Sequence, residues 1–203
     1  MCTFRFSDYI LAVIGATVAA ISLSSCKNTK TDNSSDNQTN KEAEVKTLDV
    51  DYLATLFCKG SDEPMAKIYL GEEKDNLFAV SKDIVNRFST VYGQFQYDNS
   101  LQFRVWDAAD GTKILGVNLI EESEDSRRLY LNFYRYDVEK DALVPDEALD
   151  NKIEETVKAL NTSLYVFRVP TEQSSDDITL GYWDKDENYQ EIILHWDGTT
   201  FNR

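Results

Sequence analysis

Residues 128–136 read RLYLNFYRY, and their alternation decides the fold class. Successive side chains of an extended strand point to opposite sides, so Leu129, Leu131 and Phe133 share one face. The opposite face carries three tyrosines and an asparagine: Tyr130, Asn132, Tyr134 and Tyr136. The stretch therefore predicts a strand with one face in the core. Its second face is either covered by a helix or left open as a binding surface.

Similar alternating segments occur on both sides of this stretch. We expect strands at about residues 101–106, 113–120, 128–136, 164–169, 177–183 and 190–196. Short closing strands follow at Leu143-Val144 and Thr200-Phe201, each after an aromatic-Asp pair that favours a turn. Strands joined by such short connections pair antiparallel.

Four segments carry the spacing of amphipathic helices. The first contains Val50 to Phe57 and ends before Gly60, and the second follows Ser61 with Pro64 near its first turn. The third spans about 81–92 before Gly93, and the fourth runs after Pro145 to about Leu160. Ser81 and Asp146 are the side chains expected to cap the last two. The predicted fold class is therefore α+β, with antiparallel β-meanders and packed helices.

The order of elements repeats along the chain. Phe103-Arg104-Val105 recurs as Phe167-Arg168-Val169, Leu115-Gly116 as Leu180-Gly181, and Tyr136-Asp137 as Trp196-Asp197. We interpret the body as two tandem helix-plus-meander repeats, at about residues 81–145 and 146–203, which share a core because one copy buries too little surface. Chance likeness between two meanders is the alternative.

The N-terminus has the pattern of a secretory signal. Tyr9–Leu23 carries no charge and is shorter than the about 20 apolar residues of a bilayer-spanning helix. It ends in Leu23-Ser24-Ser25-Cys26. This resembles the lipobox of bacterial lipoproteins, and the resemblance implies that the signal is cut after Ser25 and that Cys26 carries the lipid. Several acyl chains would anchor the protein to a membrane.

The stretches Asn132–Pro145 and Ile192–Phe201 resemble the closing segments of uncharacterised envelope lipoproteins of Bacteroidota. The tandem helix-plus-meander plan is similar in architecture to β-lactamase inhibitor proteins and small envelope assembly lipoproteins, and such a likeness implies no function. Lys27 and its neighbours lack both the inner-membrane retention Asp and the acidic residues of some surface lipoproteins. We therefore expect the periplasmic face of the outer membrane.

The chain divides into three parts. Residues 1–25 are the expected signal peptide, and residues 26–46 are the lipidated cysteine with a polar tether that contains only two apolar residues, Ala43 and Val45. Residues 47–203 form the folded domain. With Cys2 removed and Cys26 lipidated, Cys58 has no partner for an internal disulfide.

Charge and composition exclude several classes of function. The chain has 21 Lys+Arg against 36 Asp+Glu, a net charge of −15, which opposes binding to nucleic acid. We expect no cofactor, and no catalytic residue is assigned. Cys58 and His195 are the remaining thiol and imidazole, but no local motif supports a nucleophile there. Asp184, Asp186 and Asn188 have the alternating oxygens of a calcium loop, although Tyr189 stands where that loop needs glycine, so we expect a polar hairpin without metal.

The tyrosine set of residues 130–136 is the candidate binding face, for a sugar by stacking or for a protein by aromatic anchors. We therefore hypothesise a membrane-anchored envelope lipoprotein with a non-catalytic protein- or glycan-binding domain. An envelope hydrolase that acts through two carboxylates is one alternative. A structural or assembly lipoprotein is the other.

Overall fold

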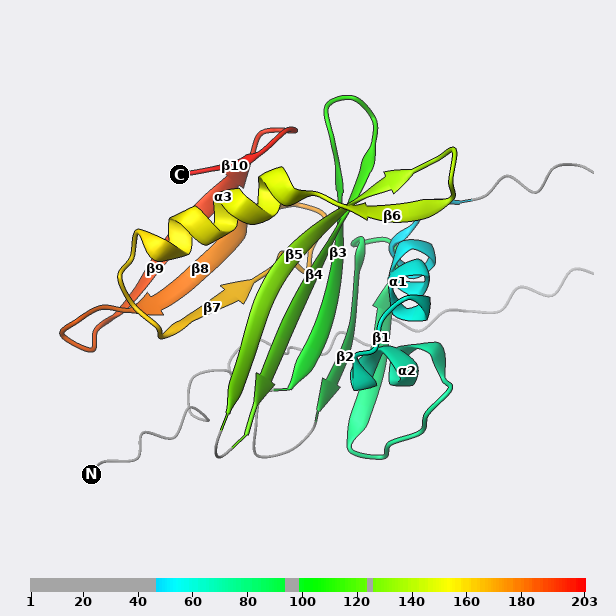
Figure 1. Ribbon diagram of the computed structural model, residues 1–203, viewed down its shortest axis with the longest axis horizontal. Helices are drawn as coiled ribbons and strands as arrows, with labels where there is room; N and C mark the ends of the chain where they lie inside the picture. Colours follow the sequence, from blue (N-terminus) through cyan, green and yellow to red (C-terminus); the bar gives the residue numbers. More distant parts are fainter. Residues whose placement is uncertain (1–46, 94–98, 124–125) are drawn as a thin grey trace, which may run out of the picture. The chain divides into compact units, whose positions relative to one another are not determined.

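A computed structural model describes residues 47–93, 99–123 and 126–203. They form an α+β domain built on two antiparallel sheets (Figure 1), which confirms the predicted fold class. The predicted signal sequence, the predicted lipobox with Cys26 and the predicted tether lie outside the described residues.

Three helices and ten strands follow one another along the described chain. They are α1 (Val50–Lys59), α2 (Pro64–Leu70), β1 (Phe78–Asp83), β2 (Phe88–Gly93), β3 (Ser100–Asp107), β4 (Lys113–Glu122), β5 (Arg127–Asp137), β6 (Ala142–Pro145), α3 (Glu147–Lys158), β7 (Tyr165–Arg168), β8 (Ile178–Trp183), β9 (Tyr189–Trp196) and β10 (Phe201–Asn202). The six strands β1–β6 form one meander in sequence order, and β7–β10 form a second. All eight predicted strands are confirmed.

Three of the four predicted helices are confirmed: as expected, α1 ends before Gly60, α2 has Pro64 in its first turn, and Asp146 caps α3. The carboxylate of Asp49 accepts the amide of Tyr52 at 2.9 Å at the start of α1, and Asp146 accepts that of Leu149 at 3.2 Å at the start of α3. Pro64 is the first residue of α2, where its missing N–H costs nothing. No helix within the described residues is long and apolar enough to cross a membrane.

The predicted helix at residues 81–92 is wrong, because this segment is the hairpin of β1 and β2. Its apolar residues do not form one stripe: Val91 is buried, whereas Ile84 and Val85 lie exposed at the turn. The carboxylate of Asp83 accepts the backbone amide of Asn86 at 3.0 Å, a local bond that favours a turn over a helix. The first copy of the proposed repeat therefore lacks its predicted helix.

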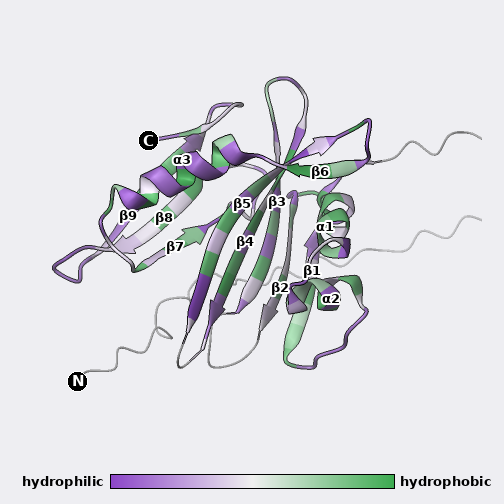
Figure 2. Cartoon of the chain, in the orientation of Figure 1, coloured by the Kyte–Doolittle hydropathy of each residue, from purple (hydrophilic) through white to green (hydrophobic). Residues whose placement is uncertain are grey.

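The six-stranded sheet separates two hydrophobic cores because its central strands are apolar on both faces. Leu101, Phe103 and Val105 of β3 pack under α1 and α2. Trp106, on the opposite face, lies in the second core with α3 and the inner face of the four-stranded sheet. Figure 2 shows α3 with hydrophobic and hydrophilic residues side by side, as expected for a helix with one buried face.

Side chains of the six-stranded sheet donate hydrogen bonds to backbone carbonyl groups of β7, the edge strand of the four-stranded sheet. In β7 the carbonyl groups of Tyr165 and Phe167 accept hydrogen bonds from Arg127 (2.6 Å) and the buried amide of Asn118 (3.2 Å). Buried Arg104 binds the carboxylate of Asp176 at 2.9 Å, just before β8. These bonds fix the inner face of the second sheet toward the core, so its outer face points away from it.

Candidate functional site

The predicted tyrosine face of β5 lies beneath the N-terminal helices. The ring of Tyr134 packs edge-on against Phe57 of α1 at 5.4 Å, and Tyr136, 6% exposed, meets Tyr52 at 6.3 Å. Tyr130 is half-buried and its hydroxyl donates to Glu63 at 3.4 Å. Asn132 is also half-buried. Burial raises the pKa of Tyr130 and Tyr134, so both phenols stay neutral. The four residues share one face, and much of that face serves as core.

Cys58 and His195 are not brought together. Cys58 is 3% exposed in the core beneath α1, and burial raises the pKa of its thiol to about 12, the opposite of what a nucleophilic cysteine needs. His195 lies on the outer face of β9, where its Nδ1 is 2.9 Å from the carboxylate of Asp177.

The acidic turn between β8 and β9 is organised by its own backbone. Asp184 accepts the amides of Asp186 and Asn188 at 2.9 and 3.0 Å, and these bonds lower the pKa of its carboxyl. Its oxygens therefore hold the turn. Among the described residues, no group of three or more His, Cys, Asp or Glu side chains is placed to hold a metal.

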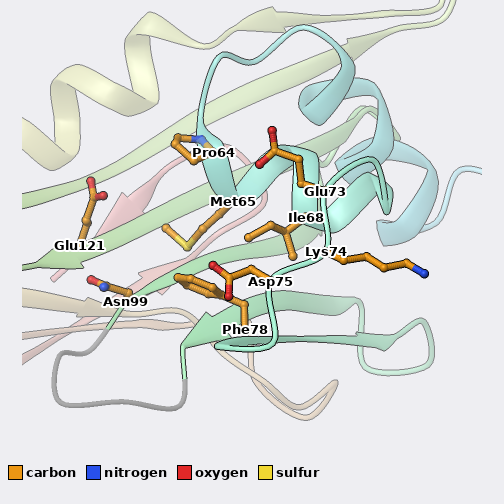
Figure 3. Close-up of a pocket in the computed structure, with 9 residues that line it drawn as sticks. All are labelled: Pro64, Met65, Ile68, Glu73, Lys74, Asp75, Phe78, Asn99 and Glu121. Carbon is orange, nitrogen blue, oxygen red and sulfur yellow. The ribbon is translucent and has the colours of Figure 1, made fainter.

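A cavity of about 260 Å³ lies between α2 and the start of β1 (Figure 3). Its apolar wall is Met65, Ile68 and Phe78. The polar groups around it are engaged elsewhere: Asp75 accepts the amide of Leu77 at 2.8 Å, and Glu121 pairs with Arg128. Lys74 extends away from the other lining residues in Figure 3. These bonds indicate that the polar side chains around the cavity stabilise the surrounding structure.

The outer face of the four-stranded sheet carries a different set of groups. Strand pairing aligns its side chains in rows: Leu164, Trp183 and Tyr189; Val166, Gly181 and Glu191; Arg168, Thr179 and Ile193; and Asp177, His195 and Asn202. The apolar packing partners of this sheet lie on its inner face. Leu164 and Ile193 are both 50% exposed and Tyr189 is 39% exposed, values that a covered sheet face would not show.

Tyr189, the first residue of β9, is held in a fixed position on this outer face. Its hydroxyl receives a hydrogen bond from Arg168 at 2.5 Å and donates one to Glu191 at 2.8 Å, while Arg168 also binds Glu191 at 2.7 Å. The hydroxyl end of the ring lies directly over Gly181, since a Cβ there would stand 2.3 Å from the Tyr189 hydroxyl and 2.9 Å from its nearest ring carbon. Trp183 meets the same ring at 5.0 Å and 60°. The phenol is thus held at its oxygen and supported from below.

Electrostatics keep the Tyr189 phenol and the Glu191 carboxylate in defined protonation states. Burial, followed by the hydrogen bond to Glu191, raises the pKa of Tyr189 to about 12. The same hydrogen bond is the main cause that lowers the pKa of Glu191, assisted by Arg168. At neutral pH the site therefore presents a neutral phenol, a carboxylate and a guanidinium. Their charges cancel, so the site suits an uncharged polar ligand more than an ion.

The sequence pattern predicts strands that contain Arg168, Gly181 and Glu191 and marks none of them as a site, and it places Tyr189 in the loop before residues 190–196. Alternation in Ile178–Trp183 does separate an inner set of Ile178, Leu180 and Tyr182 from Thr179, Gly181 and Trp183. Glycine between two strand residues is a recognised sign of close approach by another group. That signal marks Gly181 in the sequence, but it does not reveal that Tyr189 is the approaching group.

Comparisons with protein-family models, with curated proteins and with solved structures found no significant match to this chain. What the domain does is therefore inferred from its own residues.

Proposed function

We propose that this chain is an envelope lipoprotein, anchored by lipid on Cys26, whose domain binds a protein or glycan partner without catalysis. The pattern Leu23-Ser24-Ser25-Cys26 supports the anchor. The binding surface in this proposal is the outer face of β7–β10. The same N-terminal pattern, followed by Lys27, favours the periplasmic side of the outer membrane.

The observation that carries the proposal is the combination of groups on that outer face. Trp183, Tyr189 and Arg168 belong to the residue types that dominate binding energy at interfaces. Exposed apolar side chains such as Leu164 and Ile193 cost free energy in water, and a partner would relieve that cost. The fixed position of Tyr189 also lowers the entropy lost on binding.

Site-specific photocrosslinking tests the surface in cells that make the full chain. A benzophenone amino acid replaces Ile193, on the outer face, or Val85, a control that is 75% exposed at the β1–β2 turn. Benzophenone reacts with C–H bonds of proteins and sugars alike. We expect a discrete adduct from position 193 that position 85 does not give. Identical adduct patterns at both positions would remove the outer face as the binding surface.

Metabolic labelling with a fatty-acid probe tests the anchor. Cys26→Ala should abolish the label and release the protein from membranes, whereas Cys2→Ala should change neither, because the signal sequence is removed. Label that persists on the Cys26→Ala variant would refute the lipoprotein assignment.

We also propose that the meanders β3–β6 and β7–β10 arose by duplication, without the helix at residues 81–92. Both have the same strand order. Phe103 lies opposite Val117, two residues beyond Leu115, whereas Phe167 lies opposite Leu180 itself. A register difference of two residues keeps each side chain on its face. A crystal structure in which the two meanders fail to superpose would argue against duplication.

A further inference from the structure

We infer that the outer face of β7–β10 binds a neutral glycan, with a sugar ring stacked on Tyr189. This inference rests on the proposed function, since it takes that face as the binding surface. It adds the chemical class of the ligand, which follows from the geometry of the ring, from the polar groups around it and from the distribution of charge over the face.

The first argument is the orientation of the tyrosine ring. Gly181 has no side chain, so the hydroxyl end of the ring can lie close over the strand backbone at this position. Hydrogen bonds from Arg168 and to Glu191 hold the hydroxyl. An aromatic face carries partial negative charge, and the C–H groups on one side of a pyranose ring are weakly positive. A ring whose position is already fixed offers its exposed aromatic surface with little loss of side-chain entropy on binding.

The second argument is the hydrogen-bonding capacity beside the ring. A guanidinium has five N–H donors in a planar fork, and Arg168 uses its two terminal nitrogens toward Glu191 and Tyr189. Glu191 receives both of its hydrogen bonds on Oε1, which leaves Oε2 for a further donor. Donors and acceptors side by side match the neighbouring hydroxyl groups of a sugar, each of which both donates and accepts.

The third argument separates a glycan from a protein partner. Cores of protein interfaces are depleted in charged residues, with the polar groups at the rim. This face differs from such a core: the charged Arg168 and Glu191 lie in its two middle rows, beside the exposed Ile193, and the exposed Leu164 lies in an end row. A centre of paired charges suits a ligand rich in hydroxyl groups better than the apolar centre of a protein interface.

The fourth argument separates neutral from anionic glycans. The charges of Arg168 and Glu191 cancel within their salt bridge, so the site offers no net attraction to a carboxylate or sulfate. The chain as a whole carries a net charge of −15, which repels polyanions at long range. Uncharged polysaccharides are therefore the expected class.

Affinity electrophoresis of the full chain in neutral detergent tests this inference. The probes are four soluble neutral polysaccharides (a glucan, a xylan, a mannan and a galactan) and two polyanions, polygalacturonate and carboxymethylcellulose. We expect at least one neutral polymer to retard the chain and neither polyanion to do so. Tyr189→Ala should weaken binding at least tenfold. Tyr92→Ala is the matched control, since Tyr92 is 41% exposed on the other sheet and should leave binding unchanged.

Tyr189→Phe separates the contribution of the aromatic ring to binding from the contribution of its fixed orientation. The variant keeps the aromatic face and removes the hydroxyl that holds it. We expect an intermediate loss, about three- to tenfold. Unfolding midpoints of all variants should match the parent, which shows that the fold is intact.

The possible outcomes distinguish this inference from the function on which it rests. Retention of the chain by none of the neutral polymers, or equal retention of Tyr189→Ala, overturns the glycan assignment. If position 193 then still crosslinks to a protein, the outer face remains a binding surface and only the ligand class is wrong. If position 193 gives no specific adduct either, both proposals fail.

Discussion

Two sheet faces of the domain carry aromatic side chains, and they differ in whether helices cover them. On β5, Tyr130, Tyr134 and Tyr136 share a face that α1 and α2 pack against. On the second sheet, Trp183 and Tyr189 share the outer face, and their sheet packs into the core through its other side. The difference teaches that a strand's alternation defines two faces, while a distant segment of the chain decides which of them is covered.

The hydroxyl partners of the tyrosines reflect the same difference. On the covered face Tyr136 donates to Asp141 at 2.7 Å, and Tyr52 of α1 donates to the same carboxylate oxygen at 2.6 Å, so helix and sheet are joined through one acid. On the open face Tyr189 bonds to Arg168 and Glu191, which lie on its own sheet. The first network joins two elements of the core, and the second positions a ring at the surface.

Tyr136→Ala should have the largest effect on stability. The ring is 6% exposed and packs against Tyr52, so its removal leaves a cavity between α1 and the sheet. We expect a loss of about 3–5 kcal/mol in the free energy of unfolding, measured by urea denaturation. Tyr136→Phe keeps the ring and should cost only about 1 kcal/mol. A cost below about 1 kcal/mol for the alanine variant would mean that this face is open as well.

Gly116→Ala should have the next largest effect. A Cβ at Gly116 would stand 2.5 Å from the ring of Trp106, which is fully buried between Phe133 and Phe201 and has no space to move. Overpacking of this kind costs about 1–3 kcal/mol. Gly60→Ala is the control, because its Cβ would meet only a carbonyl oxygen at 3.8 Å. Equal unfolding midpoints for the two variants would contradict the tight packing between the sheets.

Alkaline pH should weaken the covered region through Cys58. Its folded pKa of about 12 lies above the ordinary value of 9.0 because burial disfavours the thiolate. The thiol therefore contributes its full stability below pH 9, and this contribution is lost as the pH rises from 9 toward 12. The expected slope is about 1.4 kcal/mol per pH unit in that window. Urea unfolding at pH 8, 9, 10 and 11 measures this slope. Cys58→Ala should reduce the dependence of the free energy of unfolding on pH. An unchanged slope in that variant would refute the assignment of the effect to Cys58.

The sequence predicts most of this fold because its strands alternate clearly and its helices have capped ends. Gly60 marks the end of α1 and Asp146 caps α3, and the strand order follows from short turns. The error at residues 81–92 has a physical reason. Ile84 and Val85 match a helical stripe by spacing, but in the fold they are exposed turn residues between two strands.

The candidate site is less predictable than the fold. The tyrosines of β5 have the pattern of a binding platform, yet α1, which covers them, precedes β5 in the chain by many residues. The outer-face site depends on Gly181 and Tyr189, which lie on neighbouring strands and whose contact follows from pairing register. Local sequence shows which side chains share a face, whereas register and packing order decide which of them meet.

Gly181→Ala should have the smallest effect on stability and gives the sharpest contrast with Gly116→Ala. Both substitutions place a methyl group into an aromatic ring, and the clash is closer at Gly181. Tyr189 is, however, 39% exposed and can swing into solvent, while alanine also favours the strand over glycine. We expect a change within about 0.5 kcal/mol. Displacement of the ring removes its burial and its hydrogen bond to Glu191, so the pKa of Tyr189 should fall from about 12 toward 10.0, measured by NMR of ¹³C-labelled tyrosine. A stability loss as large as that of Gly116→Ala would show that the Tyr189 ring is as confined as a core residue. The outer face of β7–β10 would then be a covered face, like the tyrosine face of β5.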